Sequence, residues 1–522
     1  MSITFRVLSL GGQATKASPK IIQLIPGNWD DYSFKTSFEV FTFDSSGQKL
    51  ALGTLKIGYS DQPNGWTRDA IPQQFEALPP GWFSLGQDVE YYQNIREKLS
   101  SEDRDFVLKG LGDVVADDAL FVTAEEQDVF RSSLMRSVSL STIHGQYRRV
   151  LSGLVVLTEF KFTYRDPGDE RTASIDIDFH VKPVSKPPTN VHVLIGRNGV
   201  GKTTLLNNMV SAIISQQGNE PQRGGFHENV TWQGWKHLPQ NYFSSVVSVS
   251  FSAFDPFVPP KDRPDRSRGV AYFYIGMKNA RSGPGGSTEQ PPKTDIDLAN
   301  DFIESLRSCL SQSAKRDRWR AAIERLESDI NFEAMNLRQL LDLDLAAAIK
   351  KATLLIGRMS SGHSIVLLTV TKLVDTVEEK TLVLMDEPES HLHPPLLSAF
   401  TRALSDLLHN RNGVAIIATH SPVVVQEVPQ SCVWKLTRLR TEGRSDRPER
   451  ETFGENVGVL TREIFGLEVA KSGFHAMLQT AVEAHGTFES ILQEYDEQLG
   501  FEAQGILRSM IATRDAAKAS TQ

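Results

Sequence analysis

The chain has 522 residues, of which 40% are hydrophobic and 23% are charged, and its formal net charge is −8. This composition is typical of a globular protein with two to four domain-sized units, and it excludes a disordered or fibrous chain. The acidic balance argues against a dedicated nucleic-acid binder, although a local basic face stays open. No run approaches the roughly 20 apolar residues of a membrane helix. The first residues lack the pattern of a signal peptide, and the two cysteines lack metal-ligand spacing, so we expect a cytoplasmic protein without membrane contact.

The first third of the chain has the pattern of strands with a helical insertion. Two β-hairpins are predicted, one over 38–59 and one over 154–181, because apolar runs flank turn-forming residues in both. Between them, apolar residues at helical spacing predict helices over about 88–148, with Ser100 as an N-cap. We therefore expect a β-rich N-terminal subdomain over 1–185.

A glycine-rich loop joins the short apolar strand Val191–Ile195 to a helix, and it has the pattern GxxxxGK[ST]. Glycines let the backbone curl around phosphates, so that its N–H groups point at them. Lys202 is expected to reach the β- and γ-phosphates of ATP, and Thr203 to hold Mg²⁺. The predicted nucleotide-binding residues of this loop are Gly196, Arg197, Asn198, Gly199, Val200, Gly201, Lys202, Thr203 and Thr204.

A second apolar strand, over 382–385, ends in the two carboxylates Asp386 and Glu387. The carboxyl ends of parallel strands face the ligand crevice of an α/β sheet. Asp386 is expected to hold Mg²⁺ through water, and Glu387 to polarise the attacking water as the general base. Such strands are common, so this assignment depends on the motifs around it.

Two further motifs supply that support. Ser360, Ser361 and Gly362 form a Ser-Gly turn before an apolar helix, and His420 follows the buried strand Val414–Thr419. The turn resembles the signature motif of ABC-type ATPases. That resemblance implies that two chains enclose two ATP molecules, with this turn on the partner's γ-phosphate. It also implies that His420 is the switch histidine that senses the γ-phosphate. His363 stands where the family more usually has Gln or Glu.

The Asp-Glu-Pro-Glu-Ser-His-Leu-His-Pro sequence over 386–394 narrows the family. It is similar to the RecF/SMC-like branch, which includes OLD proteins and many ATPases of prokaryotic phage-defence systems. The resemblance covers about 160–428. It implies an α/β P-loop NTPase of ABC-head type with a mixed central sheet, an N-terminal antiparallel β subdomain beside the nucleotide base, and a helical subdomain. The units expected after the first are an ATPase first half over 186–278, a linker and helices over 279–358, an ATPase second half over 359–435, and a mainly helical tail over 436–522.

One part of the family pattern is missing, because no Gln ends the predicted strand over 246–251. Ser252 and Asp255 are the candidates for its role, although residues at strand ends more often have only a structural role.

An OLD-type TOPRIM nuclease would need a Glu and an Asp-x-Asp pair on strand ends after the ATPase. No Asp-x-Asp occurs over 421–522. The pair Asp176/Asp178 lies on the wet face of a predicted strand, and the pair Asp342/Asp344 lies in a predicted helix. We therefore predict that this chain carries no nuclease and that any cutting is done by a partner.

Two basic stretches are candidates for contact with DNA or RNA, with solvated surface as the alternative. One is the predicted helix 315–320, where Trp319 either stacks on a base or packs in the core. The other is a polar loop that contains Arg438, Arg440, Arg444, Arg447 and Arg450.

The leading hypothesis is an ATPase that forms a homodimer or higher oligomer through ATP and drives or gates DNA or an effector protein, with a nuclease among the candidate effectors. Phage defence is the setting that the resemblance favours. The alternatives are a DNA repair or recombination ATPase of RecF/SMC type and a non-hydrolysing, ATP-held scaffold, against which the intact Glu387 argues. A transporter ATPase is disfavoured by the long N-terminal part and the motif over 388–394.

Overall fold

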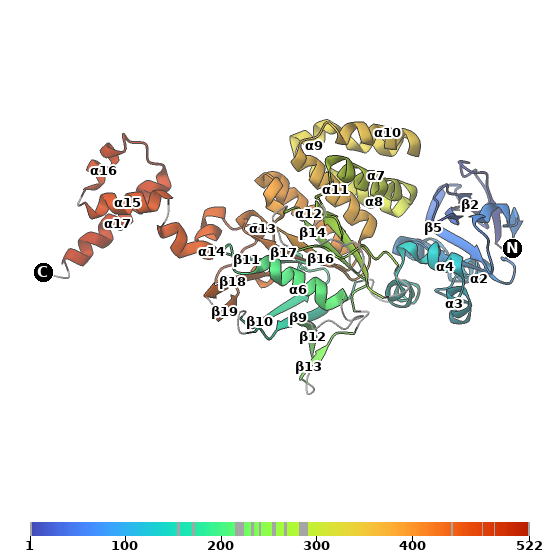
Figure 1. Ribbon diagram of the computed structural model, residues 1–522. Coiled ribbons are helices and arrows are strands. Elements are labelled where there is room, and N and C mark those ends of the chain that lie inside the picture. Colours follow the sequence, from blue (N-terminus) through green and yellow to red (C-terminus); the bar gives the residue numbers. More distant parts are fainter. Residues whose placement is uncertain are drawn as a thin grey trace.

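The computed structural model describes residues 3–153, 157–169, 173–214, 224–230, 234–239, 242–252, 257–265, 269–280, 291–439, 442–471, 473–484 and 486–519. A central α/β unit stands between an N-terminal unit and a group of C-terminal helices (Figure 1). None of the helices among these residues is long and apolar enough to cross a membrane.

The central unit is built on a seven-stranded sheet in the order β15-β14-β16-β17-β11-β18-β19. Its strands are β11 (Val191–Gly196), β14 (Ser245–Ser250), β15 (Ala271–Gly276), β16 (Thr381–Asp386), β17 (Val414–Thr419), β18 (Val433–Leu439) and β19 (Glu442–Asp446). All neighbouring pairs are parallel except β18 and β19. Every residue of β11 and of β17 is buried, as expected of parallel strands covered on both faces. The expected mixed α/β sheet is confirmed.

Alternate residues of these strands face two different cores. Val193 and Ile195 of β11 pack among helices, whereas Leu194 packs on the other side with α6 (Lys202–Ile214). The helical side contains α7 (Asp295–Ser311), α8 (Ser313–Leu326), α10 (Leu345–Ile356), α11 (Ser361–Thr376), α12 (Pro394–Asn410) and α13 (Pro422–Gln426). The two layers hold the central strands rigidly, which fixes the positions of the strand ends.

An antiparallel sheet in the order β10-β9-β12-β13 covers the α6 side. Its strands are β9 (Phe160–Asp166), β10 (Ile175–Val181), β12 (Gly225–Val230) and β13 (Gly234–His237). The predicted second hairpin is therefore confirmed where the structure describes it. Its place in a subdomain over 1–185 is wrong, because β9 pairs with β12, which follows the phosphate-loop helix, and Phe162 packs on Phe226 and Phe243.

The N-terminal unit has a separate core over residues 3–151. Its mixed sheet contains β1 (Thr4–Val7), β2 (Ile21–Pro26), β4 (Ser37–Phe43), β5 (Lys49–Tyr59), β7 (Gln74–Phe75) and β8 (Trp82–Gly86), and a second pair joins β3 (Phe34–Lys35) to β6 (Gly65–Trp66). The β4–β5 hairpin confirms the prediction over 38–59. The helices are α1 (Val89–Lys98), α2 (Ser101–Gly110), α3 (Asp118–Glu125), α4 (Asp128–Ser132) and α5 (Arg148–Leu151), with a π-helical turn η3 (Thr142–Tyr147). Ser100 caps α2 as predicted.

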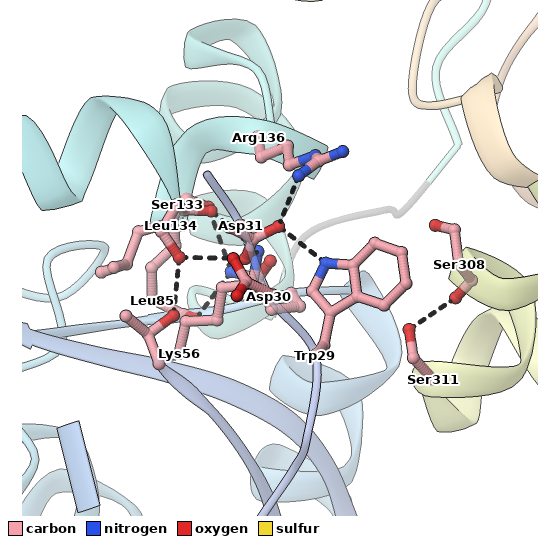
Figure 2. Close-up of polar contacts among 12 residues, drawn as sticks. Trp29, Asp30, Asp31, Lys56, Leu85, Ser133, Leu134, Arg136, Ser308 and Ser311 are labelled. Carbon is pink, nitrogen blue, oxygen red and sulfur yellow. Dashed lines mark hydrogen bonds and ion pairs between the residues drawn. The ribbon is translucent and has the colours of Figure 1, made fainter. Parts of the chain in front are cut away.

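A buried cation ties this unit together (Figure 2). The side chain of Lys56 is 0% exposed, and its ammonium lies 2.7 Å from a carboxylate oxygen of Asp31. It also donates to the carbonyl of Ser133 at 2.7 Å, while Arg136 and the Trp29 indole N–H contact the other Asp31 oxygen. Because a buried charge is costly without a partner, this network fixes β5 against the loop before β3 and the turn after α4.

The helical layer corrects one prediction and decides between two alternatives. The helix α8 ends at Leu326, and Ile330 opens the separate α9 (Ile330–Met335), where it is 80% exposed. Asp342 ends the short helix η6 (Leu337–Asp342) and Asp344 caps α10, so this pair does not lie within one helix. Trp319 packs and does not stack on nucleic acid, since it is fully buried and its indole donates to Thr371.

The cations of α8 are also bound within the molecule. Lys315 lies 2.7 Å from Asp375, Arg318 lies 2.7 Å from Asp88, and Arg320 pairs with Asp317 within the helix. Lys315 and Arg318 are buried. Lys315 and Arg318 therefore hold helices together and are not available to DNA or RNA.

The second basic stretch is a β-hairpin at the sheet edge and not a polar loop. The predicted boundary at 435/436 falls inside β18, which pairs with β11. The Arg447 guanidinium stacks over Trp434 and donates to the carbonyl of Val433, so it serves the hairpin itself. Arg440 lies outside the described residues. After the hairpin come α14 (Val457–Lys471), α15 (Gly473–Glu483), α16 (Phe488–Glu494) and α17 (Phe501–Ala519), the last three around a small core of their own.

Asp88 joins the N-terminal unit to the central unit. It caps α1, and its two oxygens lie 2.6 Å from Arg411, just after α12, and 2.7 Å from Arg318 of α8. All three side chains are at most 7% exposed. Although burial opposes ionisation, the two guanidinium groups hold the pKa of Asp88 well below its usual value.

We expect Asp88→Ala to lower the free energy of unfolding by about 3–5 kcal/mol, because it leaves the buried Arg411 without its carboxylate and leaves the buried Arg318 with only Glu90, at 3.3 Å. Urea unfolding measures the change. Asp446→Ala is the matched control, because its partner Arg444 is 79% exposed, and we expect it to cost about 1 kcal/mol or less. Equal effects of the two substitutions would contradict this account of the junction.

Candidate nucleotide-binding site

The site lies where the parallel strands β11, β16 and β17 end. β17 pairs with both of the others, and the registers place Ile195 beside Thr419 and Asp386 beside Ala418. The segments that follow these strands therefore meet at one edge of the sheet, as expected for a ligand crevice in an α/β fold. They carry the phosphate loop, the two carboxylates and His420, which are far apart in the sequence.

The phosphate loop has the conformation that its glycines allow. Gly199 and Gly201 have φ angles of +80° and +95°, which residues with a Cβ rarely adopt. A Cβ on Gly199 would meet no atom within 4 Å, so the loop opens on free space. At Gly196, by contrast, a Cβ would lie 2.3 Å from the carbonyl oxygen of Leu436 on β18. The loop, together with Arg197, Asn198, Val200 and Thr204, leads into α6, which begins at Lys202.

Lys202 lies across the loop that precedes it. Its ammonium is 3.0 Å from the carbonyl oxygen of Gly196 and 3.2 Å from that of Arg197, and it reaches His420 Nε2 at 3.1 Å. Burial lowers the pKa of Lys202 below its usual value, and the carboxylates Glu387 and Asp386 oppose that shift. This cation therefore lies inside the loop, where a phosphate can replace the carbonyl contacts.

Thr203 and Asp386 lie together at the start of α6. The Thr203 hydroxyl donates to the Asp386 carboxylate at 2.7 Å, although 183 positions separate them. A hydroxyl and a carboxylate are the oxygen ligands that Mg²⁺ prefers, and such sites leave places for water and phosphate oxygens. The pair therefore fits Mg²⁺ with its nucleotide.

Glu387 and His420 form the next contact. Glu387 follows β16 with a left-handed backbone, φ 46°, which turns its side chain out of the strand. Its carboxylate is 2.7 Å from His420 Nε2. Sequence analysis gave no role to Glu389, yet its carboxylate accepts from the backbone N–H of His420 at 2.5 Å. The acidic residues over 386–389 were the only feature of the sequence that pointed to Glu389.

The signature turn caps α11. The Ser360 hydroxyl accepts from the backbone N–H of His363, and Ser360 and Ser361 are exposed. A Cβ on Gly362 would lie 2.4 Å from the carbonyl oxygen of His391, so only glycine lets the turn approach the segment after Glu387 this closely. The turn is thereby joined to η7 (Pro388–His391) of the same chain.

Ser250 is a better candidate for the missing Gln than Ser252. The β14–β16 register places Ser250 directly beside Asp386, whereas Ser252 lies two residues past the end of the strand. The Ser250 hydroxyl is buried and has no hydrogen-bond partner among the described residues. Asp255 lies outside those residues.

A small cavity of about 80 Å³ lies beside the phosphate loop. Thr204 and Gly201 form one wall, Asp166 and Asn208 another, and Arg438 of β18 a third. The sequence suggested Arg438 as part of a nucleic-acid surface, but the hairpin places it next to the phosphate loop.

Comparisons with known proteins agree with this geometry. Residues 288–426 match a family described as "AAA domain, putative AbiEii toxin, Type IV TA system". The matched part includes the signature turn, the two carboxylates and His420, and the phosphate loop precedes it. Protein ea59 of Escherichia phage lambda is 45% identical over 534 residues, and the alignment covers 99% of each chain. The chain belongs to the ea59 family.

Solved structures match more loosely. UvrA2 from Deinococcus radiodurans is 12% identical over 59% of this chain and 40% of its own, with a TM-score of 0.29. The protein cbiO1 from Clostridium perfringens, part of the ABC transporter complex cbiONQ, is 15% identical over 60% of this chain and 95% of its own, with a TM-score of 0.28. Because these TM-scores are low, the solved structures do not carry the fold assignment. It depends on the strand order, the phosphate loop and the family match of this chain. The chain is a P-loop ATPase with the ABC-type fold.

We expect Lys202→Ala to weaken ATP binding by about tenfold to a hundredfold, because each charge-assisted hydrogen bond to phosphate contributes roughly 1.5–3 kcal/mol. Titration with a fluorescent ATP analogue measures the affinity. Lys350→Ala, on the exposed face of α10, is the matched control and should bind ATP like the wild type. A normal affinity in Lys202→Ala would show that this loop does not hold the phosphates.

Proposed function

We propose that this protein hydrolyses ATP between two chains that close head to head, and that the closure drives or gates an effector partner. The observation that carries the proposal is the convergence of two contacts, Thr203 with Asp386 and Glu387 with His420, beside Lys202 at one edge of the sheet. These groups have the chemistry that phosphoryl transfer needs: a cation, two metal ligands, a base and a γ-phosphate sensor.

Each group has a specific task in this proposal. Lys202 leaves the carbonyl oxygens of the loop and binds the β- and γ-phosphates, while Thr203 and Asp386 hold Mg²⁺. When bound there, Mg²⁺ would supply positive charge against the phosphates. Glu387 orients and deprotonates the attacking water, and the hydrogen bond from His420 fixes the Glu387 carboxylate. Glu389 holds the backbone of His420 in place.

The nucleoside half of ATP lies in the cavity next to Thr204 in this proposal. Arg438 approaches it from β18, and Asp166 and Asn208 supply hydrogen-bonding groups. The phosphate loop then binds the triphosphate, and Ser250 contacts the water shell of Asp386.

The signature turn acts on the ATP of the second chain. Ser360 and Ser361 are exposed at the N-terminus of α11, where free backbone N–H groups attract an anion. A γ-phosphate that bridges two chains stabilises the closed dimer only until hydrolysis, so ATP sets the lifetime of the dimer.

The motif over 388–394 supports a place in the RecF/OLD-like branch. The relative in phage lambda supports a phage-related role, and phage defence is the form of that role that we propose, with DNA repair or recombination as the alternative. We propose that the effector is a separate protein, with a nuclease as the first candidate, and that the N-terminal unit transmits closure to it through Asp88.

Glu387→Gln should reduce steady-state ATP turnover by about a hundredfold or more, because it removes the general base without removing a phosphate contact. The variant should also elute as an ATP-dependent dimer in the presence of Mg²⁺. Phosphate release and size-exclusion chromatography measure the two effects. Glu489→Gln, on exposed α16, is the control. Wild-type binding of ATP without turnover by either protein would favour the nucleotide-held scaffold.

A mixing experiment tests whether the signature acts between chains. Lys202→Ala and Ser360→Arg should each be nearly inactive alone. Mixed in equal amounts, they should regain turnover, because a heterodimer contains one composite site with an intact loop from one chain and an intact signature from the other. A mixture that stays inactive, while both variants still form dimers with wild type, would place the signature within its own chain.

A further inference from the structure

Behind the signature serine lies a chain of polar contacts that the proposed function does not use. The Ser360 hydroxyl is 2.6 Å from Nδ1 of His363, and Nε2 of His363 is 3.3 Å from Oδ1 of Asp329. Exposure falls along this chain: Ser360 is exposed, and the side chains of His363 and Asp329 are 13% and 8% exposed. The contacts therefore run from the surface of α11 into the helical layer.

Asp329 is held as an anion at the inner end. Its Oδ1 accepts from the backbone N–H groups of Asn331 and Phe332 at the start of α9, and its Oδ2 lies 3.0 Å from Nε2 of His393, the cap of α12. Burial opposes ionisation, but the hydrogen bonds from Phe332, His363 and Asn331 lower the pKa of Asp329 overall. The carboxylate therefore acts only as an acceptor toward His363.

This fixes the tautomer of a neutral His363. Nε2 must carry the proton that Asp329 accepts, so Nδ1 is an acceptor and takes the hydroxyl hydrogen of Ser360. In that state the Ser360 hydrogen points inward. To donate to a phosphate oxygen, the hydroxyl must turn its hydrogen outward, which leaves an oxygen lone pair facing the Nδ1 lone pair. Two acceptors at 2.6 Å repel each other unless Nδ1 gains a proton.

We propose that His363 takes up one proton from solvent when Ser360 donates to the γ-phosphate, so that closure of the ATP dimer is coupled to protonation. This inference rests on the proposed function. The proton forms an N–H bond at Nδ1, so the ring then donates from Nδ1 to Ser360 and from Nε2 to Asp329, and no bond between heavy atoms changes. His363 is thus a positioning residue for Ser360.

The groups around His363 favour this proton in the closed state. Asp329 from the start of α9 is an anion, and the γ-phosphate adds negative charge on the Ser360 side. The opposing groups are His393 from α12, whose ring centre lies 6.4 Å away, and the N-terminal dipole of α11. The Phe332 ring, centred 5.2 Å away, is uncharged and limits access of water.

The sign of the pH dependence follows from linkage. Because closure takes up a proton, closure is strengthened as the pH falls. In the Glu387→Gln background, which keeps ATP bound, the dimer dissociation constant should fall by roughly tenfold or more from about pH 8 to about pH 6. Sedimentation measures this constant. Calorimetry of ATP binding in two buffers of different ionisation enthalpy should show an uptake approaching one proton per chain.

His363→Gln in the same background is the decisive variant, because its amide offers an N–H donor to Ser360 at every pH. We expect its ATP dimer to persist, and the extra pH slope and the proton uptake to disappear. Any slope due to other groups remains in both proteins, so the difference between them reports His363. His393→Asn, which keeps a capping side chain on α12, is the control and should retain the slope.

Three results would overturn the inference. An unchanged slope and proton uptake in His363→Gln, or their loss in His393→Asn, would assign the proton elsewhere. A dimer that forms equally at every pH in the Glu387→Gln protein would refute the coupling and leave the proposed function intact. The absence of any ATP-dependent dimer across the pH range would refute the proposed function and this inference together.

Discussion

The alignment of three parallel strands is the constraint on which the site depends. β17 pairs with β11 on one side and with β16 on the other, so the segments after all three strands emerge at one edge. Residues that lie far apart in the sequence, Thr203 and Asp386 among them, thereby come within hydrogen-bonding distance. The two apolar layers on the faces of the sheet hold this alignment, because alternate residues of each strand are buried in opposite cores. The strand ends alone therefore bring the residues of the site together, without a long loop.

Charges buried away from the site organise the rest of the molecule. Lys56 with Asp31 fixes the interior of the N-terminal unit, and Asp88 with two arginines fixes that unit to the central one. Both networks pair each charge with an opposite charge, which is the condition for keeping ions out of water. Lys202 differs, because its closest contacts are carbonyl oxygens and a histidine ring. A cation with such partners has more to gain from a phosphate than one that is already paired with a carboxylate.

The sequence was most informative where a motif and a buried strand coincide. The phosphate loop, Asp386 and His420 each follow a continuous apolar run, and such runs have few alternatives in a two-layered α/β fold. The assignment of strands to units was harder to predict. The β9–β10 hairpin could pack on the N-terminal unit or on the central unit, and its partner strand β12 follows only after α6. The partners of the α8 cations could not be predicted either. A basic helix has the same sequence pattern whether its partners are phosphates or, as here, the carboxylates Asp88 and Asp375 of distant segments. Glu389 and Ser250 had no motif of their own, since their roles depend on register and on a backbone N–H.

The helix α12 connects the segment behind the signature turn with the N-terminal unit. It begins at the cap His393, which contacts Asp329 behind the signature turn, and ends beside Arg411, which is bound to Asp88 of the N-terminal unit. With 17 residues it is about 25 Å long, and a helix of this length behaves as a stiff rod. A tilt of about 10° at the signature end would displace the far end by roughly 4 Å, given that length. Such a displacement would reach Arg411 and, through Asp88, the N-terminal unit.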